Sequence, residues 1–195
     1  MMNRPVIPTL LLAACSWWAA CTQQPAPAQA GLTPEAALQA GDSIAMQAQK
    51  TLVSALMKQL SEQGSTAALS FCNVNAIPLT DSLSRRFKCH IQRISEKNRN
   101  PDNAPATDQD RAVLQQYSEQ HGAGQPLKSV VKTEQGKTVC YKPIMVAMPA
   151  CLQCHGTPGN DISSETAQLL GEKYPADRAT GYKQGDFRGA WKITF

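Results

Sequence analysis

The feature of this chain that most constrains its fold is the run from Cys151 to His155, which reads Cys-Leu-Gln-Cys-His. Cys-x-x-Cys-His is the attachment signature of c-type haem. Two residues between the cysteines let both sulfurs reach one porphyrin ring, and the next residue then directs its imidazole at the iron. The sequence therefore predicts one covalent haem c, attached through Cys151 and Cys154, with His155 as an axial ligand of the iron.

Two other functions of a Cys-x-x-Cys pair have weaker support here. A structural zinc site usually adds a second Cys or His pair at similar spacing, and the sequence contains no such pair. A thioredoxin-like dithiol opens a helix after a strand in a βαβ unit. Covalent haem is the interpretation that also accounts for the adjacent His155.

The N-terminus agrees with haem attachment, which takes place outside the cytoplasm. Arg4 precedes a mostly apolar stretch, Val6–Ala20, that is short for a membrane span. Two lipobox-like sequences end at Cys15 and Cys21. We expect a lipoprotein-type signal segment over residues 1–21, lipidation of Cys15 or Cys21, a disordered Pro/Ala linker over 22–32 and a single domain over 33–195. Simple cleavage near Ala30 is the alternative, and either leader predicts a periplasmic protein.

Composition argues against a nucleic-acid partner. The formal net charge is +4, the Lys and Arg residues are scattered, and aromatic residues make up 6% of the chain. The expected partners are instead a redox or signalling protein and, through the lipid, a membrane. We also consider a homodimer.

The periodicity of apolar residues predicts a mixture of helices and strands. A first helix with a cap at Thr33 carries an apolar stripe to about Ser61, and Gly64 ends it. A second helix through Ala67–Cys72 ends before Pro78. The further expected elements are a strand at 87–95, a loop at 98–105, a helix at 108–122, a hairpin of 128–134 and 137–146, a short haem helix after Pro149, a helix at 164–173, a turn-rich stretch at 181–189 and a strand at 190–195. This order predicts an α+β fold with a central antiparallel sheet and long N-terminal helices.

The second axial ligand of the iron is not set by the haem motif. The candidates are Cys72, Cys89, Cys140, His90, His121, Met46, Met57, Met145 and Met148. Cys72 lies within a predicted helix and has no partner nearby in sequence. Cys89 and Cys140 both lie in predicted strands of one sheet, so a Cys89–Cys140 disulfide is possible, and it would leave Cys72 as the odd thiol.

Three blocks of the chain resemble the family of single-haem, PAS-like periplasmic cytochromes and sensors. They are Ala67–Cys72, Arg99–Pro105, and Cys151–His155 followed by Tyr174–Ala190. The resemblance covers most of residues 33–195, and the third block is its most specific part. Two segments depart from the family pattern: Ala106–Asp110, and the strand that bears Cys89 and His90.

This resemblance implies a PAS-like α+β fold in which His155 and a thiolate from the second helix, here Cys72, ligate the iron. His90 is the alternative ligand, because it lies near the expected site, on the strand that departs from the family pattern. A thiolate ligand favours ferric iron and a low reduction potential. On reduction the ligand could detach and open a site for a diatomic gas.

The expected function is low-potential electron transfer by a periplasmic single-haem cytochrome rather than catalysis. One alternative is a redox or gas sensor that signals to a partner protein, and a second is a peroxidase-like enzyme with His90 as its acid–base residue. Candidates for binding the haem propionates are Arg85, Arg86, Arg99 and Lys183.

Overall fold

The computed structural model describes residues 32–195. The predicted signal segment, both lipidation candidates and nearly all of the predicted linker lie outside the described residues. In chain order the elements are α1 (Pro34–Phe87), β1 (His90–Ile94), the 3-10 turn η1 (Pro101–Asn103), α2 (Asp108–Gly122), β2 (Val130–Glu134), β3 (Lys137–Met145), α3 (Pro149–His155), α4 (Ser164–Lys173) and β4 (Phe187–Thr194). Among these helices, none has the length and apolar character needed to cross a membrane.

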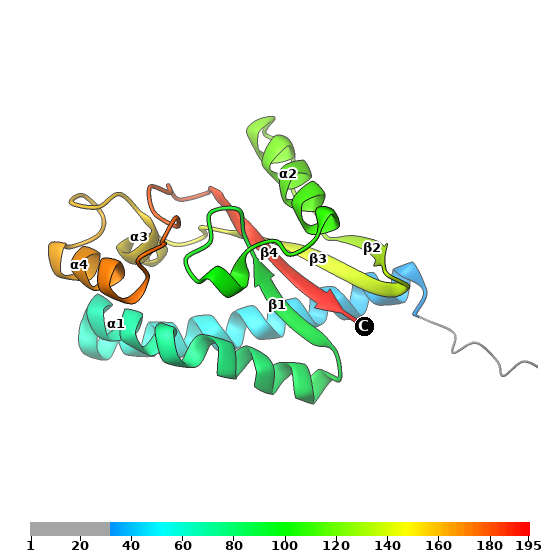
Figure 1. Ribbon diagram of the computed structural model, residues 1–195, viewed down its shortest axis with the longest axis horizontal. Coiled ribbons are helices and arrows are strands. Elements are labelled where there is room, and N and C mark those ends of the chain that lie inside the picture. The colour runs from blue at the N-terminus through cyan, green and yellow to red at the C-terminus, as the bar shows by residue number, and fades with distance from the viewer. Residues whose placement is uncertain (1–31) are drawn as a thin grey trace, which may run out of the picture. The chain divides into compact units, whose positions relative to one another are not determined.

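The four strands form one antiparallel sheet in the order β1-β4-β3-β2. Helix α1 lies along one face of this sheet and α2 lies on the other, whereas α3 and α4 lie beyond one end of it (Figure 1). The predicted α+β fold with a central antiparallel sheet is thus confirmed.

Helix α1 is 54 residues long and is broken at Gly64. Gly64 has φ 83° and ψ −179°, a conformation that is almost confined to glycine. The chain reverses there, and the two halves of α1 run back beside each other (Figure 1). Ile44 from the first half and Leu83 from the second consequently pack in one core cluster. The predicted helix end at Gly64 is the turn of this helical hairpin.

The second half of α1 does not end before Pro78, as the sequence predicted, but continues to Phe87. Proline removes the hydrogen bond to the carbonyl four residues earlier, which here belongs to Val74. Val74 is 67% exposed, so water can reach that carbonyl. The first predicted strand also begins later than expected, because Lys88 adopts a left-handed conformation that caps the helix.

Successive side chains of each strand point to opposite faces of the sheet, and apolar residues occupy both faces. Ile91, Cys140 and Trp191 pack beneath α1. Ile94, Tyr141 and other residues of the opposite face pack beneath Val113, Leu114 and Tyr117 of α2. The side of the sheet that faces α1 is the one that holds the candidate site.

Candidate functional site

The Cys-x-x-Cys-His motif forms helix α3, which Pro149 opens at its first position. Cys151 and Cys154 are free, half-buried thiols three residues apart, so they lie on the same side of this short helix. Cys151 packs against a small core of Val146, Ala179 and Tyr182. The helix is therefore fixed to the loop before β4.

His155 is held in one orientation by that same loop. Its Nδ1 donates a hydrogen bond of 2.8 Å to the carbonyl oxygen of Ala179. The ring of Tyr182 meets the imidazole edge-on, with 6.3 Å between centroids. Burial and the charges of Arg188 and Arg99 hold the pKa of His155 well below its ordinary value. The imidazole is therefore neutral, and its Nε2 has a free lone pair that can bind a metal.

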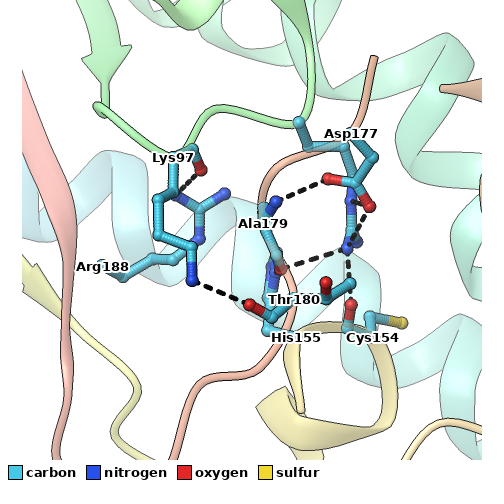
Figure 2. Close-up of polar contacts among 8 residues, drawn as sticks. Lys97, Cys154, His155, Asp177, Ala179, Thr180 and Arg188 are labelled. Atoms are coloured by element: carbon cyan, nitrogen blue, oxygen red, sulfur yellow. Dashed lines mark hydrogen bonds and ion pairs between the residues drawn. The ribbon is translucent and has the colours of Figure 1, made fainter. Parts of the chain in front are cut away.

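Arg99 and Asp177 form an ion pair that organises this loop. The Nη2–Oδ2 distance is 3.0 Å, and about a tenth of each side chain is exposed. Arg99 also donates to the carbonyl oxygens of Cys154 and Ala179, and Asp177 accepts from the amide of Ala179 at 2.8 Å. Figure 2 shows Asp177, Cys154 and His155 grouped around Ala179, with the hydrogen bond from the Ala179 amide to Asp177 drawn as a dashed line.

A cavity of about 240 Å³ lies between α1, the sheet and α3. It brings together Cys72 from the second half of α1 and Cys151, Cys154 and His155 from α3. Its apolar wall is formed by both halves of α1, with Leu52, Val53, Leu56, Leu60, Leu69, Phe71 and Ile77. The turn at Gly64 is what lets both halves of one helix line a single cavity.

Cys72 is a free, half-buried thiol in this wall. Burial raises the pKa of the Cys72 thiol, and the positive charges of Arg93 and Arg99 oppose that rise. The cavity thus holds the predicted thiol ligand and the predicted imidazole ligand together. The two arginines lessen the effect of burial on this thiol, although its pKa stays above the ordinary value.

Polar groups line the opposite side of the cavity. Three of them are arginines: Arg93 on β1, Arg99 in the following loop and Arg188 on β4. The Nε of Arg188 is buried and has no hydrogen-bond partner within the described part of the chain. An apolar pocket with three thiols, an imidazole and a guanidinium whose Nε has no partner among residues 32–195 fits a flat, largely apolar metal macrocycle that carries carboxylates. The residues present therefore fit a haem.

The remaining candidates for the second axial ligand differ in whether they line the cavity. Met145 lines the cavity, whereas Met46, Met57, Met148 and His121 do not. His90 is exposed at the start of β1 and is not among the lining residues, so the structure does not bring this alternative ligand to the site. Of the candidates for binding propionates, Arg85, Arg86 and Lys183 are exposed away from the cavity, and Arg99 lines it.

The possible Cys89–Cys140 disulfide is not formed in the part of the chain that the structure describes. Cys89 and Cys140 both contact the cluster between α1 and the sheet, but each is a free thiol. Cys89 does not lie in a strand; it follows the helix cap at Lys88, and its amide donates to the carbonyl of Ser84. Both residues thus belong to, or pack against, one core cluster as separate thiols.

The sequence prediction missed Arg93, Arg188 and Asp177 as site residues. A signal was available for Arg93, because the predicted alternation places it on the same side of the strand as Ile91, which is a core position. Arg188 falls in the stretch 181–189, for which the sequence predicts turns, whereas strand β4 already begins one residue before Arg188, at Phe187.

Together the fold and the cavity define a cytochrome-like α+β domain. The family model of Tll0287-like proteins matches residues 28–195, and the chain belongs to this family. Among solved structures the chain is similar to the cyanobacterial heme-protein Tll0287, with 26% sequence identity and a TM-score of 0.58. The similarity covers 84% of this chain and 96% of that one. A search of curated proteins gave no significant match. The family resemblance stated from the sequence is confirmed.

Proposed function

We propose that this protein is a periplasmic single-haem c-type cytochrome that transfers electrons at low potential, with His155 and Cys72 as the two axial ligands of the iron. The observation that carries the proposal is the meeting of Cys72 with the Cys-x-x-Cys-His helix in one cavity. The similarity to a solved protein described as a heme-protein supports haem as the ligand of this cavity.

Cys151 and Cys154 would anchor the cofactor. When each thiol adds across a vinyl group, its sulfur bonds to one vinyl carbon and its hydrogen moves to the other, so the step needs no oxidant. Helix α3 is short and tied to the loop before β4, and the two thioethers would therefore hold the ring at a fixed place in the cavity.

His155 is prepared for iron by its contact with Ala179. Because Nδ1 carries the donated hydrogen, the tautomer is set, and the lone pair of Nε2 remains available. Arg99 contacts the same carbonyl oxygen and ties it to Asp177. The imidazole would thus keep its direction in both oxidation states of the metal.

Cys72 would supply an anionic ligand from the opposite wall. Burial raises the pKa of this thiol, the charges of Arg93 and Arg99 oppose that rise, and binding of the sulfur to iron would favour the thiolate further. A bound haem would supply one-electron exchange between ferric and ferrous iron, and a thiolate ligand favours the ferric state. Low-potential electron transfer follows from this pair of ligands.

A redox or gas sensor is the second candidate function, and the position of Cys72 on α1 favours it. This helix contacts β1, β3, β4, α3 and α4. If Cys72 left the iron on reduction, the second half of α1 would be free to move, and this helix contacts most elements of the domain. The peroxidase alternative required His90 in the pocket, and the exposure of His90 gives it no support.

The test is an absorption and EPR comparison of the oxidised wild type with Cys72→Ala, and with Cys89→Ala as a matched thiol outside the cavity. We expect Cys72→Ala to lose the low-spin signal of thiolate ligation and to raise the reduction potential, with Cys89→Ala unchanged. A ferric spectrum that Cys72→Ala leaves unaltered would refute the ligand assignment. Purified wild type without covalently attached haem would refute the c-type cytochrome itself.

The same samples separate the carrier from the sensor. Two results favour an electron carrier: fast electron exchange with a small cytochrome, and a ferrous form that does not bind carbon monoxide. A carbon monoxide adduct that forms only after reduction favours the sensor, because it requires the bond to Cys72 to open.

A further inference from the structure

Two guanidinium groups face the cavity without a carboxylate to neutralise them. Arg99 is paired with Asp177, but neither Arg93 nor Arg188 takes part in any ion pair formed by residues 32–195. Arg93 lies on β1 and Arg188 on β4, and these two strands are hydrogen-bonded neighbours. The unpaired charges are therefore concentrated on one side of the cavity, opposite the apolar wall of α1.

The hydrogen bonds of Arg188 leave one edge of its guanidinium unused. Nη1 donates to Ser95 Oγ at 2.7 Å and to the carbonyl oxygen of Lys97 at 3.0 Å. Ser95 in turn donates to the carbonyl oxygen of Arg188 at 2.8 Å, which fixes the side chain in place. Nε is buried and has no hydrogen-bond partner among the described residues. Because Nε and Nη2 form a fork that matches a carboxylate, the geometry presents one prepared anion site.

Arg93 offers the second positive charge. Its guanidinium lies over the ring of Trp191, 5.9 Å from the centroid, and it lines the same cavity. A contact with an aromatic face holds a guanidinium in place without using its N–H groups, which remain able to donate. A buried charge without a counter-charge is costly, so two such arginines in one pocket indicate an anionic ligand.

The charges in the pocket can be counted. Three arginines against the single carboxylate of Asp177 leave two positive charges at the cavity. A haem carries two propionates, and the charge of its ferric core is balanced by one thiolate. Polar side chains at the same side of the cavity, namely those of Ser95, Asn98, Asn100 and Asn103, add further hydrogen-bonding capacity there.

We infer that Arg188 and Arg93 bind the two haem propionates, Arg188 through its Nε/Nη2 edge and Arg93 beside Trp191. This inference rests on the proposed haem binding and assigns the orientation of the ring within the cavity. The thioether edge faces α3, and the propionate edge faces β1 and β4. Arg99 is excluded from this role because Asp177 and two backbone carbonyls already occupy it.

The experiment uses the full chain with Cys151→Ser and Cys154→Ser, so that porphyrin binding is reversible. Iron protoporphyrin IX and its dimethyl ester are titrated separately and followed by absorption. We expect the free acid to bind more tightly than the ester. Arg188→Gln and Arg93→Gln should each weaken binding of the acid about 10- to 100-fold and change binding of the ester little. Arg85→Gln, an exposed arginine outside the cavity, should change neither.

Comparison of the two porphyrins separates propionate binding from a merely structural role of the arginines. The assignment would be overturned if the arginine variants weakened binding of the acid and of the ester equally. It would also be overturned if the Cys151→Ser, Cys154→Ser chain with both arginines intact bound the two porphyrins equally well. Either result would leave haem binding intact. Failure to bind either porphyrin would overturn the proposed function as well. If Arg188→Gln does not fold, Arg188→Lys keeps the charge but lacks the fork, and should weaken binding of the acid alone.

Discussion

At the scale of single residues, the orientation of His155 depends on a carboxylate that does not touch it. Asp177 binds Arg99 and the amide of Ala179, and the carbonyl oxygen of Ala179 receives the Nδ1 hydrogen of His155. Contacts of this kind around a ligating histidine set its tautomer and direction. The Arg99–Asp177 pair also bridges the loop after β1 and the loop before β4, so it stabilises the fold as well.

We expect Asp177→Asn to lower the free energy of unfolding of the cofactor-free chain by about 3 kcal/mol, because it leaves the largely buried Arg99 side chain without its counter-charge. Urea unfolding at neutral pH measures this, with Asp81→Asn, at an exposed position, as the matched control. If the two variants were equally stable, the ion pair would contribute nothing.

At the scale of elements, the helical hairpin of α1 builds the cavity. Its two halves meet at Gly64, and the second half carries Cys72 to the wall facing α3. Just after the turn, the Ser65 hydroxyl lies 2.7 Å from the Thr166 hydroxyl of α4. The turn therefore decides where the thiol lies.

Gly64→Ala should lower the free energy of unfolding by about 1–3 kcal/mol. A Cβ at this position meets no atom within 4 Å, so the cost is backbone strain alone. Gly171→Ala is the control: it lies inside α4, also in open space, and should stabilise the protein by about 0.5–1 kcal/mol. Thermal unfolding compares the two variants, and the same sign for both would contradict the strain assigned to Gly64.

At the scale of the whole domain, the two faces of the sheet differ in chemistry. The face under α1 holds the cavity, whereas the face under α2 holds a buried charge network. Lys192 lies 2.7 Å from Asp110 and 2.8 Å from Glu134, and Tyr141 donates to Asp110 at 2.8 Å. This network joins α2, β2, β3 and β4, and its residues do not line the cavity, so it can be tested separately from the candidate site.

Burial alone would raise the pKa of Asp110, but hydrogen bonds from Lys192 and Tyr141, and the charge of Lys192, hold that pKa below its ordinary value. Its stabilising effect is therefore complete above the pKa of the unfolded carboxyl, about 4, and is lost as the pH falls through the lower folded pKa. Asp110→Asn should reduce the free energy of unfolding by about 1.5–3 kcal/mol at pH 7. Urea unfolding from pH 7 to pH 2 should show this difference shrinking; a constant difference would contradict it.

Much of the fold was predictable because its signals are local. The bounds of α2 and α4, the turn between β2 and β3 and the position of α3 agree with the sequence patterns. Each depends on a cap, a turn glycine or a proline at a helix start, and such features act within a few residues. The continuation of α1 past Pro78 was missed because it depends on solvent at Val74, which the local sequence does not reveal.

By itself the sequence determined the Cys-x-x-Cys-His motif and the α+β class, and it predicted His155 as an axial ligand, since these follow from residues that are adjacent or periodic. Only the tertiary structure decided which thiol faces Cys151–His155. Within residues 32–195 it also decided that Cys89 and Cys140 are not bonded and that Arg93 and Arg188 lie in the same cavity without an ion pair. The physical reason is that these residues are far apart along the chain. Their meeting depends on the reversal at Gly64 and on the pairing of β1 with β4, which result from packing of the whole core.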